Sequence, residues 1–223
     1  MIDAVAGVEL ELHASSTPFD REGVVEWQIA GSVLVESERL ADLSAPESDV
    51  ATLGDDPEFT RVTIFVMRGL TLNLLEVDAR DALDEDSADA AEMMPLFSAD
   101  GEFTEEVEDR LGGLVGAYSF VFLDRVWLLP AWRGFGLGRV LTDKAIGMVT
   151  EAPISLVGVH SHPYEDWDEE HPDPSPDAIA RTDHVWESLG FVRVSGQLFV
   201  RDESLVHPFA EERAVSLGLI NRA

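Results

Sequence analysis

The chain has 223 residues, with 15 Lys and Arg against 44 Asp and Glu, so its formal net charge at pH 7 is −29. A chain this acidic repels phosphate backbones and anionic lipid headgroups, which argues against nucleic-acid partners and against a membrane surface. The absence of cysteine excludes disulfides, thiolate metal sites and a cysteine nucleophile. The sequence contains neither a basic leader before an apolar stretch nor about 18 consecutive apolar residues, so we expect a cytoplasmic protein.

The N-terminal half predicts three strands before any helix. Apolar residues alternate with polar ones at 8–12, and β-branched and apolar residues fill 24–35 around Gly31 and 60–75 with a break at Gly69. Residues 41–59 are rich in Asp, Ser, Pro and Gly and predict a loop. Two helices are expected next, one spanning roughly 82–94 and a short acidic one over 104–111 that ends at Gly112.

In the C-terminal half the apolar period changes from strand to helix and back. An apolar run over 114–129 ends at a proline, helical spacing follows over 139–149, and 154–159 predicts a strand buried on both faces. Ser175, Pro176 and an acid open another helix, which should end at Gly190, and two short strands follow over 191–201. We therefore expect one domain over 1–203, with a C-terminal tail over 204–223.

A glycine-rich loop lies between the first of these strands and the helix after it. Gly134, Gly136 and Gly138 allow a tight turn whose N–H groups, with the helix N-terminus, favour an anion. From Phe122 to Leu141 there are three Arg and one acid, a net charge of 3 − 1 = +2. This acidic chain therefore keeps one segment suited to a phosphate group.

The loop is neither a P-loop, which would close on Gly-Lys-Ser or Gly-Lys-Thr, nor a dinucleotide fingerprint, because Leu141 stands where the third small residue belongs. Its spacing, Arg133-x-x-Gly136-x-Gly138 after Pro130, resembles the acyl-CoA loop of the GNAT superfamily of N-acetyltransferases. The later segment Trp186-Glu-Ser-Leu-Gly190-Phe191 is similar to that family's Tyr-x-x-x-Gly-Phe motif. Together the two matches span about 114–201.

The resemblance implies an α/β fold of the GNAT type, with a mixed, mostly antiparallel sheet flanked by helices. Acetyl-CoA, as co-substrate, would enter between the strand ending at Leu129 and the strand at 154–159, which would be parallel. The acceptor would be an unidentified amine, small molecule or peptide, and a cationic one would suit the acids at 165–170. The cofactor-binding residues implied are Leu128, Leu129, Arg133, Gly134, Phe135, Gly136, Leu137, Gly138 and Arg139.

Acyl transfer to an amine needs a base and a proton donor for the leaving thiolate. The resemblance places a base near Asp124, and His160 is a second candidate at the end of the buried strand. Trp186 stands where members of that family commonly carry the Tyr that acts as the acid, and an indole cannot deliver a proton. Either another residue, such as Tyr164 or Tyr118, supplies the proton, or water does, or the enzyme is weak or inactive. No metal site is expected. A non-catalytic CoA-binding or regulatory module of the same fold is the alternative to an enzyme.

Overall fold

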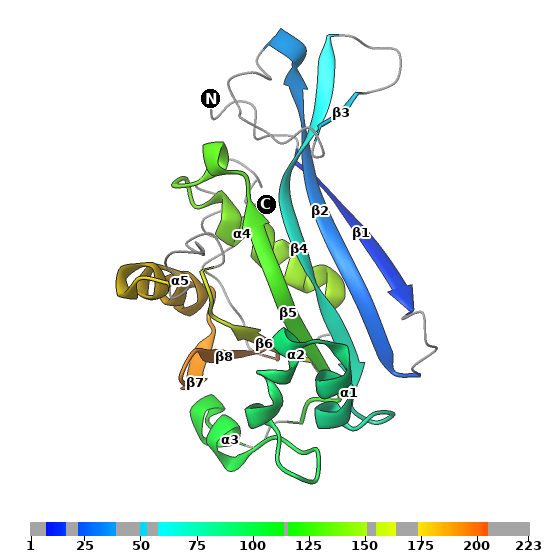
Figure 1. Cartoon of the computed structure of the whole chain (residues 1–223), viewed down its shortest axis with the longest axis vertical. Coiled ribbons are helices and arrows are strands. Elements are labelled where there is room, and N and C mark those ends of the chain that lie inside the picture. Colours follow the sequence, from blue (N-terminus) through cyan, green and yellow to red (C-terminus); the bar gives the residue numbers. More distant parts are fainter. Residues whose placement is uncertain are drawn as a thin grey trace.

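The computed structural model describes residues 8–16, 22–38, 50–52, 58–113, 116–150, 155–163 and 174–204. Eight strands form one sheet: β1 (Glu9–Ser16), β2 (Val24–Glu36), β3 (Val50–Thr52), β4 (Phe59–Asn73), β5 (Ser119–Leu128), β6 (Ser155–His160), β7 (Val192–Ser195) and β8 (Leu198–Asp202). Their order is β1-β2-β4-β5-β6-β8-β7, and β3 pairs with β4 (Figure 1). The pairing of β5 with β6 is parallel and the other pairings are antiparallel. The expected mixed, mostly antiparallel sheet is thus confirmed.

Helices cover both faces of this sheet. They are α1 (Ala79–Asp86), α2 (Ala88–Ala91), α3 (Glu105–Leu111), α4 (Leu137–Val149) and α5 (Pro176–Ser188), with 3-10 turns η4 (Met94–Leu96) and η5 (Pro130–Trp132). One apolar core joins the sheet to α4 and α5, and a second core joins the other face to α1, α2 and α3. The chain is therefore an α/β structure with the crossover helix α4 between the two parallel strands.

Most of the expected elements are present, and two differ. Residues 50–52 were expected in a loop but form β3, which pairs with Thr60–Val62 of β4. The helix expected over 82–94 is broken at Ser87, whose extended backbone ends α1 while its Oγ accepts a hydrogen bond from the Ala90 N–H at the start of α2. A local cap therefore outweighs the continuous helical spacing. All but the first residue of the C-terminal tail expected over 204–223 lies outside the described residues.

None of the helices in the described ranges combines the length and apolarity needed to cross a bilayer.

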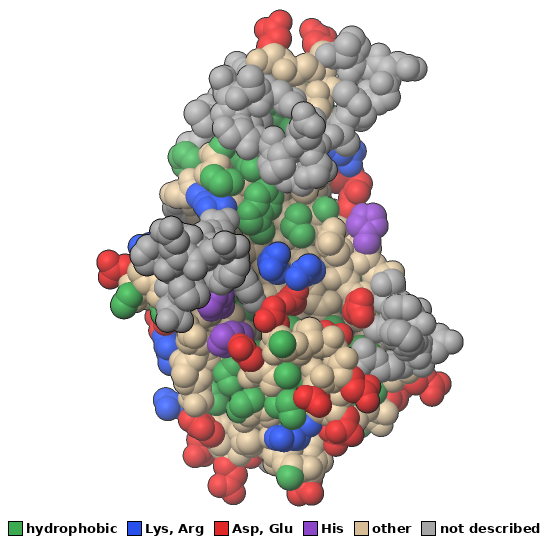
Figure 2. All heavy atoms as spheres, viewed as in Figure 1, with side chains coloured by type: hydrophobic (Ala, Val, Ile, Leu, Met, Phe, Trp, Pro, Cys, Tyr) green, Lys and Arg blue, Asp and Glu red, His purple; other side chains and the backbone are tan. Residues whose placement is uncertain are grey.

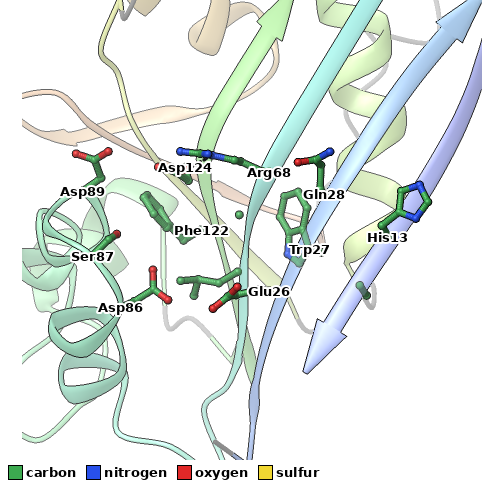
Figure 3. Close-up of a pocket in the computed structure, with 13 residues that line it drawn as sticks. His13, Glu26, Trp27, Gln28, Arg68, Asp86, Ser87, Asp89, Phe122 and Asp124 are labelled. Carbon is green, nitrogen blue, oxygen red and sulfur yellow. Dashed lines mark hydrogen bonds and ion pairs between the residues drawn. The ribbon is translucent and has the colours of Figure 1, made fainter. Parts of the chain in front are cut away.

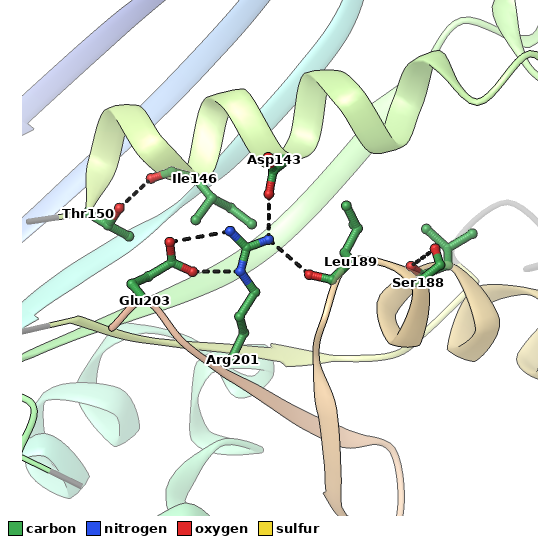
Figure 4. A network of polar contacts seen from close by, with 8 residues as sticks. Asp143, Ile146, Thr150, Ser188, Leu189, Arg201 and Glu203 are labelled. Carbon is green, nitrogen blue, oxygen red and sulfur yellow. Dashed lines mark hydrogen bonds and ion pairs between the residues drawn. The ribbon is translucent and has the colours of Figure 1, made fainter. Parts of the chain in front are cut away.

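Arg201 of β8 joins the crossover helix α4 to β8 and to the end of α5. Its side chain is 4% exposed, and its guanidinium contacts Asp143 of α4 at 2.7 Å, Glu203 at 2.6 Å and the Leu189 carbonyl at 3.0 Å (Figure 4). A buried cation satisfied by two carboxylates and a carbonyl is costly to break, because each partner would be left in a poorly solvated place. This network fixes the position of α4, whose N-terminus follows the glycine-rich loop.

Replacing Arg201 should therefore lower the free energy of unfolding markedly. We expect Arg201→Met to cost about 3 kcal/mol, since Asp143 and Glu203 lose their shared partner. Arg181→Met, at an exposed position of α5, is the control and should stay within about 0.5 kcal/mol of the wild type. Urea denaturation followed by circular dichroism measures both, and equal stabilities of the two variants would contradict the role given to Arg201.

Candidate functional site

The two parallel strands pair over only part of their length. The β5–β6 ladder runs from Ser119 opposite Ser155 to Leu123 opposite Val159. Beyond that point β5 continues to Leu128 while β6 ends at His160, so residues 125–128 of β5 pair with β4 alone among the described strands. The sheet therefore opens beside the second half of β5, where Figure 2 shows apolar side chains gathered above the charged middle of this face.

A β-bulge lies where the two strands part. Arg68 of β4 is opposite Arg125 and Gly69 is opposite Leu123, so Asp124 is the additional residue on β5. Gly69 permits this arrangement, because a Cβ there would lie 2.0 Å from the Phe122 carbonyl oxygen and 2.8 Å from the Trp27 ring. Asp124 therefore lies in a bulge, which positions its carboxylate.

The hydrogen-bond alternation of β5 defines which backbone groups face the opening. The Leu129 N–H donates to the Ile64 carbonyl of β4 at 2.8 Å. Because hydrogen-bonded pairs alternate along an antiparallel ladder, Trp127 and Arg125 also direct their backbone N–H and C=O groups toward β4. Val126 and Leu128 consequently direct their N–H and C=O groups toward the open side. Arg133 occupies one end of this edge, because its Nε donates to the Leu128 carbonyl at 2.8 Å.

The glycine-rich loop leads from this edge into α4. Gly134 and Gly136 have φ values of +83° and +77°, which L-residues with a Cβ rarely adopt. Gly136 is the N-cap of α4, no side chain caps the helix, and the first turn contains no acidic residue. The N-terminal amides of a 13-residue helix, with Arg133 and Arg139 nearby in sequence, thus form a place suited to an anion.

The same region contains buried polar atoms without a partner. The indole nitrogens of Trp132, in η5, and Trp186, in α5, make no hydrogen bond within the described residues although both atoms are buried. Both rings belong to the core beneath α4. Trp186 packs edge-on against Phe191, with ring centroids 5.2 Å apart. Packing in the core explains the position of the Trp186 ring.

A cleft of about 610 Å³ lies on the α1–α2 side of the sheet, next to the bulge (Figure 3). Its sheet wall comes from β2, β4 and β5, and its other walls from β1 and the junction of α1 with α2. Asp124 lines it and is paired with Arg68, whose Nε lies 2.5 Å from Asp124 Oδ2. The charged lining residues are Arg68, Glu26, Asp86, Asp89 and Asp124, a net charge of 1 − 4 = −3.

His160, at the end of β6, is held by the carboxylate of Glu92, the C-cap residue of α2. Its Nδ1 lies 2.6 Å from Glu92 Oε2, and its ring stacks on His162 with centroids 6.2 Å apart. Burial lowers the pKa of His160 below the ordinary 6.5, and this outweighs the opposing attraction of Glu92. His160 follows Val159, which pairs with Leu123, so the histidine lies near Asp124 of the cleft lining. At neutral pH the imidazole is neutral, and with Nδ1–H donated to Glu92 its Nε2 can accept a proton.

Two of the catalytic candidates thus gather at the opening of the sheet, and others do not. Tyr118 precedes β5 and lies six residues from Asp124, about 20 Å along the strand, which removes it as a proton donor there. Tyr164 and the acids at 165–170 lie outside the described residues. Leu129 and Leu137 are buried in the core, so only their backbone groups can serve a ligand, whereas Phe135 is exposed. No metal-binding cluster occurs among the residues that the structure describes.

Sequence reasoning missed Arg68, Glu92 and the acidic cleft. Glu92 follows Asp89 by three residues, and this i, i+3 spacing puts both on one side of the helical junction. The spacing was available in the sequence, but the packing of that junction over β5 and β6 was not. Arg68 could have been noticed as the only cation within the apolar centre of β4, next to the glycine that interrupts it.

No protein-family model matches the chain, and neither the curated proteins nor the solved structures contain a match to it.

The bulge can be tested at Gly69. Gly69→Ala should lower the free energy of unfolding by about 1–3 kcal/mol, because its methyl group would collide with the Phe122 carbonyl. The control is Gly147→Ala in α4, where a Cβ meets nothing within 4 Å and should stabilise the helix by about 0.4–1 kcal/mol. Urea denaturation measures both. A Gly69→Ala protein as stable as the wild type would contradict the close approach.

The environment of His160 can be tested by NMR titration of its ring protons. We expect a midpoint below 6.5, and a further decrease in Glu92→Gln, because the Glu92 carboxylate raises the pKa against the larger effect of burial. Because the pKa of His160 is lower in the folded protein, the unfolded chain binds the imidazole proton more tightly than the folded one. Protonation therefore favours unfolding, and the contribution of His160 to stability falls as the pH drops below 6.5.

Glu106→Gln, an exposed acid of α3 that is not among the charges acting on His160, serves as the control and should leave the midpoint unchanged. An increase of the midpoint in Glu92→Gln would show that the contact does not hold the imidazole as described.

Proposed function

We propose that the protein is an acetyl-CoA-dependent N-acyltransferase of the GNAT type that acts on an amine. The observation that carries the proposal is the position of Asp124. This residue lies at the point where β5 leaves β6, so it borders both the acidic cleft and the open strand edge that leads to the α4 N-terminus. An amine in the cleft and an acyl-CoA along the edge would meet there.

The backbone around the opening fits acyl-CoA in two respects. The pyrophosphate would bind the first amides of α4, with Arg133 and Arg139 contributing charge, because a helix N-terminus without a side-chain cap favours an anion. The pantetheine arm, an extended chain with amide groups, would pair with the backbone of Val126 and Leu128 as an added strand does. The buried, unpartnered indole N–H of Trp132 belongs to the turn that precedes the loop.

The acyl-CoA supplies an acetyl thioester, whose C–S bond breaks as the acceptor nitrogen forms the C–N bond. The protein must remove a proton from the acceptor, which arrives as an ammonium ion. His160 is the better placed of the two base candidates, because Glu92 can hold Nδ1–H and leave Nε2 to accept the proton. Asp124 Oδ2 accepts a hydrogen bond from Arg68, which makes this carboxylate a poorer base. In the proposal, Asp124 holds the ammonium group and His160 removes the proton. The acceptor nitrogen would lose its second proton as the C–S bond breaks, and that proton would pass through water to the leaving thiolate, while the first proton leaves His160 for the solvent.

A non-catalytic CoA-binding module remains the second candidate, and Trp186 favours it. Its indole occupies the position of the family's usual acid, cannot transfer a proton at neutral pH and is packed against Phe191. Both candidates predict acetyl-CoA binding, and only the enzyme predicts release of the CoA thiol when an amine is added.

Acetyl-CoA should bind and stabilise the protein. At a concentration one hundred times its Kd it should add about 2.7 kcal/mol to the free energy of unfolding, which a thermal shift detects. Arg139→Glu should weaken binding roughly tenfold or more, because a charge-assisted hydrogen bond to the pyrophosphate becomes a repulsion. Arg139 is a cleaner test than Arg133, whose Nε also holds the end of β5.

Arg110→Glu makes the same charge change on α3, which packs on the opposite face of the sheet, and should leave the affinity unchanged. Isothermal titration calorimetry compares the three proteins. Absence of binding heat and of a thermal shift at millimolar acetyl-CoA would refute both candidate functions, and an equal loss in both variants would place the pyrophosphate elsewhere.

A further inference from the structure

We propose that the acidic cleft binds an aliphatic diamine, with one ammonium group at Asp124 and the other between Glu26 and Asp86. The inference rests on the proposed acyltransfer for its role, because it makes the diamine the acceptor. The lining of the cleft indicates the substrate class. The acids at 165–170, expected to attract a cation, do not indicate one.

The cleft presents two anionic ends separated by an apolar floor. Figure 3 shows Asp124 and Arg68 on one side of Phe122, and the carboxylates of Glu26 and Asp86 on the other. Leu70 and Phe122 are opposite each other on β4 and β5, are nearly buried, and form the floor between the two ends. An unbranched chain of methylene groups suits this floor, and a charged or branched stem would not.

The strand register sets the length of the ligand. Glu26 of β2 is opposite Leu70 of β4, and Asp124 lies on β5, so the two acids are separated by two strand spacings. Phe122 is the β5 residue opposite Leu70, and Asp124 lies two residues further along β5. Two spacings of about 4.8 Å across the sheet and about 6.6 Å along the strand place the two backbones about 12 Å apart. With each ammonium in contact with its carboxylate, a chain of about four or five methylene groups spans the interval.

The charges favour two positive groups over one. Four acids against Arg68 leave the cleft at −3, so a monoamine compensates one charge and a diamine compensates two. Arg68 stays paired with Asp124, and the reacting ammonium shares that carboxylate with it. The volume of about 610 Å³ is within the range of small-molecule sites, which favours a free diamine over a peptide segment.

The test compares putrescine, a diamine with four methylene groups, with butylamine, which has the same chain and one charge. Calorimetry at constant ionic strength, without acetyl-CoA, should give roughly tenfold tighter binding of putrescine, the contribution of a second charge-assisted contact. Glu26→Gln should remove most of this preference and leave acetyl-CoA binding unchanged. Glu105→Gln, an exposed acid of α3 outside the cleft, makes the same charge change and should keep the preference.

Equal affinities for the two amines, or a preference that survives in Glu26→Gln, would overturn the proposal. A preference lost equally in Glu105→Gln would also overturn it, because the overall negative charge would then be the cause. If acetyl-CoA binds normally but putrescine shows no preference over butylamine, this substrate class is rejected and the proposed acyltransferase function is not. A Glu26-dependent putrescine site without any acetyl-CoA binding supports the cleft and rejects the acyltransferase.

Discussion

Gly69 allows the Phe122 carbonyl and the Trp27 ring to approach the β4 backbone more closely than any side chain would permit. The extra residue that this approach accommodates on β5 is Asp124, and the parallel pairing with β6 ends next to it. The open strand edge, the entry to the cleft and the position of the carboxylate therefore all depend on one crowded backbone contact. Bulges commonly re-aim a side chain in this way beside functional sites.

The charge of the molecule is divided between two neighbouring surfaces. Acids predominate around α1, α2 and α3 and in the cleft that their junction helps to form, as Figure 2 shows for this end of the molecule. The α4 N-terminus has no acid in its first turn and has Arg133 and Arg139 beside it. An anionic co-substrate and a cationic acceptor would thus be attracted to opposite sides of Asp124, although the net charge of −29 alone favours only the cation.

The sequence predicted a helix or strand correctly where a single local signal, such as a cap residue or an alternating apolar pattern, determined it. Ser175 and Pro176 set the start of α5, Gly112 ends α3, and alternation identified the long strands. Ser87 overruled the helical spacing around it, and β3 depends on pairing with β4 that no local pattern reveals. The glycine-rich loop was visible as a motif, whereas the cleft joins residues from five distant segments, so only the folded register brings Asp124, Arg68 and Glu26 together.

Amide hydrogen exchange with and without acetyl-CoA tests the central claim most directly, since it reports the strand edge and the helix N-terminus separately. The account predicts slower exchange on binding at Val126 and Leu128 of β5 and at Gly138 and Arg139 of α4, with no change at the β4-facing amide of Leu129. Protection at α4 without protection at β5 would contradict a co-substrate lying along the open edge. Protection at neither segment would contradict the account of the site.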